Sequence, residues 1–487
     1  MGIIAKQSIY NTVSIGLAFL IGAANILFLY PTFPGKEFQG LVVALLANSN
    51  LIQPFISFGV QHTLIKFFSS TKSKEDQDRL LWFSIGLPFL ILALILPFYY
   101  NYNSQILDFL SNSNGTLLQF PFLIIAVAIA TAFFEIFFSW LRVHLQSVFG
   151  NFLKEVYPRL MTLILLLLHA FDVIDLDQFI TFLIFGYYLR LIIIAIYSFS
   201  VYFPTFQWKL PSQWKPMLRY SVLIFISGAA ASFILDIDKS MIFSLISDEN
   251  AAFYAVAVYI AAVIEAPARA MFQITSPLVA KALNDQDKDR LKSLLKKSSI
   301  NLLLVGGLAF LVINLNLNDL YSLINQEGYD SAASVVIIVS IAKLFSISMG
   351  CLNNIISNSK YYHYVFWFSV SSALLAIALN LVFIQTYGIM GAAFATLLVL
   401  VFINVCKIIL VAVVFKIQPY SFKSLSVLVS MFLIYDLIYW IPTLLHPLLS
   451  IGIRTLLIVG LFSIPMFLFR WSEDIELVIQ RLKARLF

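Results

Sequence analysis

Residues 252–297 read AFYAVAVYIAAVIEAPARAMFQITSPLVAKALNDQDKDRLKSLLKK, a long apolar run followed at once by a strongly basic segment. A bilayer core of about 30 Å takes about 20 apolar residues to cross as a helix. Basic residues collect in the cytoplasmic loops of membrane proteins. This stretch therefore predicts a membrane-spanning helix that ends at the cytoplasmic side.

The same pattern recurs along the chain, which alternates between apolar stretches and short loops. A helix is expected for each stretch, because it satisfies its own backbone hydrogen bonds in lipid. The sequence therefore predicts an all-α polytopic membrane protein with about 14 transmembrane helices. The stretches lie near 8–30, 40–62, 80–100, 117–140, 157–171, 178–202, 217–237, 252–274, 298–315, 331–357, 361–384, 388–415, 424–445 and 449–469.

The basic residues give this helical chain a topology. With the N-terminus inside, most of the 31 Lys and Arg fall in cytoplasmic segments, and only Lys36 and Lys239 fall in the opposite loops. We therefore expect both termini to be cytoplasmic. The remaining basic residues lie within the spans: Arg190, Arg269, Lys343, Lys407 and Arg454.

Composition excludes several function classes. The chain is 61% hydrophobic and 11% charged. Its net charge of +6 is explained by basic loops facing anionic lipid, so no nucleic-acid partner is expected. It has no GxxxxGK[ST] phosphate loop and no HExxH zinc motif, and its histidines are scattered, so no metal and no cofactor are expected. Cys351 and Cys406 lie in apolar spans and are interpreted as packing residues.

Charges inside the spans carry most of the functional signal. A charged side chain at the centre of the bilayer costs at least about 2.5 kcal/mol, so it must face a cavity or a partner. Arg190 and Lys343 fall near the centres of their spans, where reaching an interface is hardest. For these two we expect a water-filled cavity. Lys407 and Arg454 lie within reach of an interface, and for Asp436 a packing hydrogen bond is expected.

Glu265 and Arg269 are four residues apart on one helical face, with Pro267 between them. The pattern predicts an ion pair beside a helix break. Such a pair suits a moving or solvated segment, or it locks two spans together.

The remaining intramembrane carboxylates are Glu135, Asp236 and Asp238. Asp236-Ile237-Asp238 has the DxD spacing that metal-dependent glycosyltransferases use. The polar outer end of the span near 217–237 explains the same residues without a metal.

Hydropathy also indicates a two-fold repeat. When the second half of the chain is laid on the first, Pro54 meets Pro267 and a basic loop follows in both halves. We therefore expect a six-helix lobe at 1–208, a second at 209–416, and a terminal helix pair with a cytoplasmic tail at 417–487.

Three segments resemble a known family. They are PGKEFQGLVVALLANSNLIQPFISFGVQHTLIKFF at 34–68, FYAVAVYIAAVIEAPARAMFQITSPLVAKAL at 253–283 and YGIMGAAFATLL at 387–398. They are similar to segments of bacterial polysaccharide and oligosaccharide flippases, the Wzx-like polysaccharide transporters of the multidrug/oligosaccharidyl-lipid/polysaccharide superfamily. Gln39, between Phe38 and Gly40, departs from the usual Phe-Gly pair of the family.

The resemblance implies a transporter rather than an enzyme. A flippase of this kind moves an undecaprenyl-diphosphate-linked oligosaccharide across the bacterial cytoplasmic (inner) membrane by alternating access of two lobes. A cationic cavity suits a diphosphate, so the substrate-binding candidates are Arg190, Arg269 and Lys343. The partners implied are this lipid-linked oligosaccharide, membrane lipids and a coupling proton or sodium ion. The residues that would orient the cations or bind the ion are Glu135, Asp236, Asp238 and Glu265.

Other functions stay open at this point. A multidrug or cation antiporter of the same superfamily would favour acidic residues over cations in its cavity. A polytopic glycosyltransferase or polysaccharide polymerase is disfavoured because no large outer loop is present. A scaffold without transport activity is the remaining alternative.

The topology is testable by cysteine labelling. We expect an impermeant thiol reagent to modify a cysteine introduced at Asn114 in intact cells and to leave one at Ser73 unmodified, because Ser73 lies in a basic loop. The measurement is mass-tag labelling of the two variants, with permeabilised cells as the control. Labelling at Ser73 without labelling at Asn114 would overturn the topology.

Overall fold

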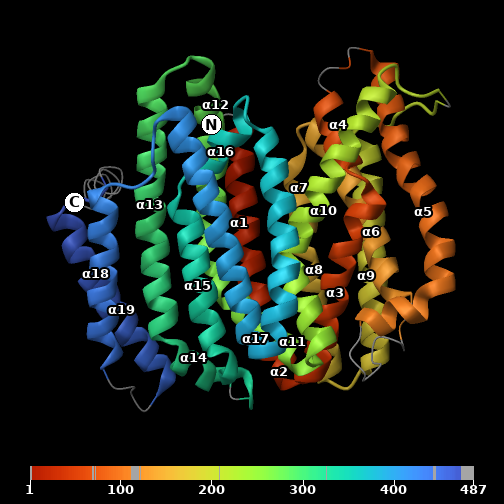
Figure 1. Ribbon diagram of the computed structural model, residues 1–487. Coiled ribbons are helices and arrows are strands. Elements are labelled where there is room, and N and C mark those ends of the chain that lie inside the picture. Colours follow the sequence, from red (N-terminus) through yellow and green to blue (C-terminus); the bar gives the residue numbers. More distant parts are fainter. Residues whose placement is uncertain are drawn as a thin grey trace. The chain divides into compact units, whose positions relative to one another are not determined.

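The computed structural model describes residues 3–68, 71, 73–110, 120, 122–207, 209–324, 326–441 and 446–472. Every regular element in this part of the chain is helical (Figure 1). The chain divides into two compact units, Met1–Ala255 and Val256–Phe487. The three-part division expected from the repeat stays a prediction.

The first unit is built from long helices and a few short ones. The helix α1 continues through a π-helical turn, η1 (Ala24–Leu29), into α2. Helix α11 begins in this unit and runs across the boundary. The bounds are α1 Ile3–Ala23, α2 Tyr30–Thr32, α3 Lys36–Ser57, α4 Val60–Phe68, α5 Lys74–Leu110, α6 Leu123–Val143, α7 Ser147–Glu155, α8 Tyr157–Ala170, α9 Leu176–Val201, α10 Trp214–Leu245 and α11 Asp248–Ala262.

The second unit contains the remaining helices. Two short 3-10 turns, η3 (Val263–Glu265) and η4 (Tyr329–Ala332), lead directly into α12 and α15. The bounds are α12 Ala266–Asn284, α13 Lys288–Leu315, α14 Leu317–Ile324, α15 Ala333–Ser348, α16 Leu352–Asn358, α17 His363–Phe415, α18 Phe422–Tyr439 and α19 Pro447–Leu468.

Among the described residues, 12 helical segments are long and apolar enough to cross a membrane. One of them, α17, has 53 residues and is interrupted at Gly388, so it supplies two spans. The apolar α8 has only 14 residues and adds a shorter one. The all-α polytopic fold is therefore confirmed, and the expected count of about fourteen agrees with these helices.

Glycines set two of the breaks. The stretch near 40–62 forms α3 and α4 instead of one helix, because Phe58 and Gly59 both adopt positive φ. A Cβ at Gly59 would lie 2.7 Å from the carbonyl oxygen of Ser221 on α10, so only glycine allows this approach. Gly388 has φ 58° and ψ −138°, a conformation open to glycine alone, and it bends α17.

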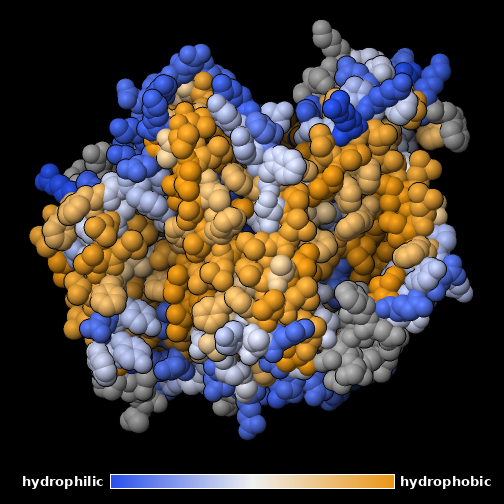
Figure 2. Space-filling view, viewed as in Figure 1, coloured by the Kyte–Doolittle hydropathy of each residue, from blue (hydrophilic) through white to orange (hydrophobic). Residues whose placement is uncertain are grey.

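Each unit has its own apolar core and an apolar exterior. In the first, Trp140 and Leu64 are fully buried, and in the second Leu311 and Ile458 are. Large apolar side chains such as Leu94 and Val413 are exposed. Figure 2 shows apolar side chains across the middle of the visible face and polar ones at its ends. This distribution is that of a chain whose surrounding solvent is largely lipid.

Candidate functional site

In the first unit, Asp236 lies in a polar cluster within α10. Its Oδ1 accepts from Lys239 Nζ at 2.6 Å, and its Oδ2 accepts from Asn50 Nδ2 of α3 at 3.2 Å. Helix α10 extends to Leu245, beyond the end of the span expected near 217–237, so this carboxylate lies inside the helix. At this position α10 packs against α3, which supplies Asn50 to the cluster.

Asp238 is 5% exposed and points to a different neighbour. Its Oδ2 accepts from the Tyr254 hydroxyl of α11 at 2.6 Å, and its Oδ1 accepts from the backbone N–H of Lys239 at 2.8 Å. The cluster thus holds two carboxylates and one ammonium. It joins α3, α10 and α11 and has an excess of negative charge.

Glu135 lies in the middle of α6 and pairs with a residue that the sequence pattern assigned to a cytoplasmic segment. Lys154 Nζ of α7 lies 2.6 Å from its Oε1. On its own helix, the positions one turn away from Glu135 carry Thr131 and Ser139, which are uncharged. Because Glu135 has no basic neighbour one turn away on its own helix, the sequence alone indicates that its partner has to come from another element.

Arg190 is 5% exposed near the middle of α9. Its guanidinium carbon lies 4.3 Å from the ring centre of Phe134 and 4.8 Å from that of Tyr187. Its Nη2 donates to Thr131 Oγ1 at 3.4 Å, and its Nε has no hydrogen-bond partner in the described part of the chain.

The carboxylate of Glu135 on α6 is already paired with Lys154. No carboxylate pairs with Arg190 directly among the described residues. The aromatic faces give it partial compensation. Arg190 is therefore a buried cation without an anion of its own.

In the second unit, Lys343 of α15 donates to Glu265 Oε2 of η3 at 3.0 Å. The helix break expected at Pro267 is present, because the chain changes from α11 to a 3-10 turn over 263–265 before α12 begins. The sequence pattern paired Glu265 with Arg269; the structure gives it Lys343 as a partner from another helix.

Arg269 and Lys407 are the other basic residues of this unit considered for the site. Arg269 is exposed on the first turns of α12. Lys407 is half-buried on the second half of α17 and has no ion pair or hydrogen bond with any residue that the structure describes. That Arg190, Arg269 and Lys343 line one cavity stays a prediction.

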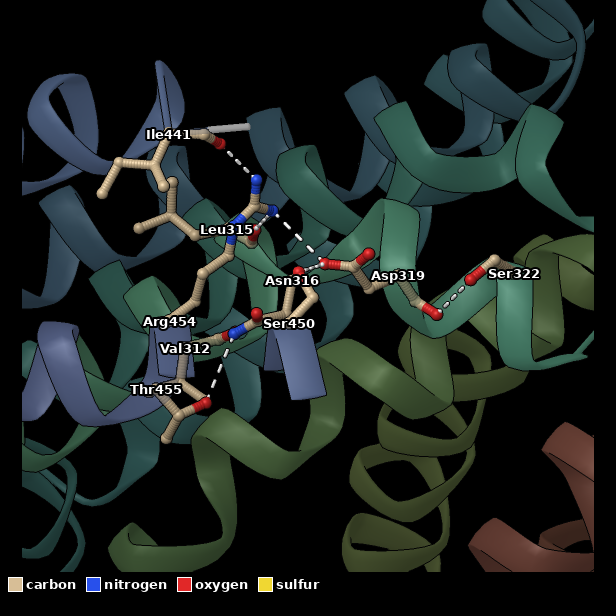
Figure 3. A network of polar contacts seen from close by, with 9 residues as sticks. All are labelled: Val312, Leu315, Asn316, Asp319, Ser322, Ile441, Ser450, Arg454 and Thr455. Atoms are coloured by element: carbon tan, nitrogen blue, oxygen red, sulfur yellow. Dashed lines mark hydrogen bonds and ion pairs between the residues drawn. The ribbon is translucent and has the colours of Figure 1, made fainter. Parts of the chain in front are cut away.

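Arg454 does not reach toward an interface as its position in the sequence indicated. It is 8% exposed on α19 and pairs with Asp319 of α14, with 3.4 Å between Nη1 and Oδ2 (Figure 3). Nη1 also donates to the carbonyl oxygen of Leu315 at 3.2 Å, and Nη2 donates to that of Ile441. Ser450 Oγ donates to the same Asp319 oxygen at 2.6 Å.

This network links α19 and the residue Ile441 after α18 to α13 and α14, so its role is to hold these helices together. Asp319 was missed because it follows an apolar stretch in a segment expected to be a loop. The packing hydrogen bond expected at Asp436 is absent: this side chain is exposed near the end of α18 and has no partner among the described residues.

The geometry can therefore do two things chemically. Ion pairs neutralise Glu135, Glu265 and Asp319 within the helices. Arg190 and Lys407 have no ion-pair partner among the described residues, and the two aromatic rings beside Arg190 compensate its charge only in part. Such groups can attract an anion, whereas the paired ones are suited to hold helices together.

Solved structures share this fold. The lipid II flippase MurJ in an inward closed conformation aligns over 96% of this chain and 99% of its own, with a TM-score of 0.73 and 16% identity. An inward-facing multidrug resistance MATE family transporter of the MOP superfamily aligns over 83% of this chain and 95% of its own, with a TM-score of 0.58 and 12% identity. A mutant of the Vibrio cholerae MATE transporter VcmN aligns over 82% of this chain and 93% of its own, with a TM-score of 0.57 and 15% identity. The chain thus has the fold that these membrane transporters share.

The family follows from the sequence itself. A family model described as "Polysaccharide biosynthesis protein" matches residues 4–283, which is more than half of the chain. The chain belongs to this family, and the resemblance to polysaccharide flippases of the MOP superfamily is confirmed. A search of curated protein sequences found no match.

The Lys343–Glu265 pair is testable by a double-mutant cycle of Lys343→Met, Glu265→Gln and the two substitutions together. We expect Lys343→Met to lower the melting temperature of the purified protein, because it leaves Glu265 charged and unpaired inside the helices. Adding Glu265→Gln to that variant should restore at least half of the loss. The measurement is thermal unfolding in detergent, with Lys292→Met on the exposed part of α13 as the control. A double variant less stable than Lys343→Met would show that no coupled pair exists.

Proposed function

We propose that the protein is a flippase that moves an undecaprenyl-diphosphate-linked oligosaccharide between the leaflets by alternating access. Arg190 is the observation that carries this proposal. A buried guanidinium without its own carboxylate is costly, and an anionic cargo would compensate it during transport. Family membership supports a polysaccharide cargo, and the fold shared with a lipid II flippase supports a lipid-linked one.

The chemistry of the cations fits a diphosphate. A guanidinium can donate two parallel hydrogen bonds to phosphate oxygens, which an ammonium cannot do. We propose that Arg190 and Arg269 donate these paired hydrogen bonds to the diphosphate, and that the ammonium groups of Lys343 and Lys407 attract it by their charge alone. Because Lys343 already pairs with Glu265, it would contact cargo only if that pair opened.

The carboxylates have a separate proposed role. The ammonium of Lys239 pairs with Asp236, whereas Asp238 accepts from the Tyr254 hydroxyl and the backbone N–H of Lys239. The cluster therefore has one carboxylate more than it has ammonium groups, and a proton or a sodium ion would neutralise it. We assign ion coupling to this cluster. Glu135 and Glu265 would orient the cations instead, because each is paired with a lysine.

The proposal includes the setting. The protein would lie in a bacterial cytoplasmic (inner) membrane with both termini cytoplasmic, which is the orientation that the basic loops favour. Its cargo would then move from the cytoplasmic to the outer leaflet.

Multidrug or cation antiport is the second candidate, and the fold shared with MATE transporters favours it. A cationic drug would be repelled by Arg190, which has no ion-pair partner among the described residues. It would also gain nothing from Lys407. The distribution of charge therefore supports an anionic cargo over a cationic one.

An export assay tests the proposal. In cells whose surface polysaccharide depends on this protein, we expect Arg190→Ala and Arg269→Ala each to reduce surface glycan at least about tenfold, since each removes a charge-assisted contact to diphosphate. The corresponding Lys variants should restore part of the export. The measurement is surface glycan by immunoblot, normalised to the amount of protein in the membrane.

Two controls separate binding from structure. Arg290→Ala removes a charge from an exposed position on α13 and should leave export unchanged. The variant that combines Glu265→Gln with Arg269→Ala should stay inactive. Glu265 already pairs with Lys343, so removing its charge should not make up for the loss of Arg269. Export at the wild-type level in both Ala variants, or full recovery in the double variant, would contradict the proposal.

A further inference from the structure

A pocket of about 410 Å³ lies in the second unit, where α13, α18 and the residues after α19 meet. Helices α13 and α18 pack against each other in this unit (Figure 1). The described residues that line the pocket are Ser293, Lys296, Lys297, Ile300, Asn301, Ser421, Phe422, Lys423, Trp471 and Ser472.

The pocket is basic. Three lysines line it, and none of the described lining residues is acidic. Lys423 Nζ donates to the carbonyl oxygen of Arg470 at 2.7 Å, a neutral acceptor that leaves its charge in place. Helix α18 begins at Phe422, so the amides of its first turn add partial positive charge at the same place. The wall therefore favours an anion.

The pocket also lies at the level where two helices become apolar. On α13 the charged residues end at Lys297, and Ile300 begins the apolar part. On α18, Phe422 is 85% exposed beside Lys423. Trp471, which is 1% exposed, lines the pocket, and its Nε1 donor has no acceptor among the described residues. Lysines next to aromatic rings at the start of a span are typical of the lipid headgroup region.

We propose that this pocket binds the phosphate of an anionic phospholipid headgroup, with Lys296, Lys297 and Lys423 as the cationic contacts. Basic pockets between membrane helices recognise such headgroups. A membrane lipid fits better than a free anion, because the exposed Phe422 would contact the acyl region while the lysines contact the phosphate. The inference is independent of the cargo, since none of these residues belongs to the candidate transport site.

The test is retention of lipid by the purified full-length protein. Native mass spectrometry in detergent would compare phosphatidylglycerol with phosphatidylcholine for the wild type and for two variants. One variant carries Lys296→Gln, Lys297→Gln and Lys423→Gln. The matched control carries Lys281→Gln, Lys288→Gln and Lys292→Gln, which remove the same charge from exposed positions outside the pocket lining.

We expect the wild type and the control to retain phosphatidylglycerol over phosphatidylcholine. The pocket variant should retain at least about tenfold less phosphatidylglycerol, because each lysine near the headgroups adds to the attraction. A variant with Arg at the three pocket positions should retain it, which shows that charge and not folding is at issue.

Three results would overturn the inference. The first is an equal loss in the pocket variant and the control, which would mean diffuse attraction to any basic residue. The second is no loss in the pocket variant. The third is displacement of phosphatidylglycerol by millimolar inorganic phosphate, which would make the pocket a site for free anions.

Discussion

The high free energy of a charge in hydrocarbon is the constraint on which the rest of this structure depends. It explains why Glu135, Glu265 and Asp319 each meet a basic residue from a different helix. Since lipid supplies no hydrophobic drive between helices, such polar contacts help to fix which helices pack together. Three of the links between helices in this fold are therefore electrostatic.

The same constraint makes the exceptions informative. Arg190 is buried, contacts two aromatic rings and has no carboxylate of its own, and Lys407 has no partner that the structure describes. Because Glu135, Glu265 and Asp319 are each paired, an unpaired cation within the same helices calls for some other compensation. An anionic cargo that passes through the membrane would do so, and this links packing to the proposed transport.

Much of the fold was predictable from sequence because hydropathy and helix length are local properties. The apolar stretches became helices, and the Pro267 break appears as a 3-10 turn. The ion-pair partners were not predictable. Lys154 and Asp319 lie in segments that sequence assigned to loops, and the residue that pairs with Glu265 is 78 positions away. Such pairings depend on which helices pack together, and hydropathy contains no information about that.

Movement of a defined lipid-linked cargo between the two leaflets of sealed vesicles tests the central claim most directly. Purified protein would be reconstituted in liposomes that carry either a fluorescent undecaprenyl-diphosphate-linked oligosaccharide or the same oligosaccharide on an uncharged undecaprenyl ether. Loss of fluorescence to an impermeant quencher would report movement between leaflets. The account predicts faster movement than in protein-free vesicles for the diphosphate cargo alone. Equal rates for the two cargoes would contradict it.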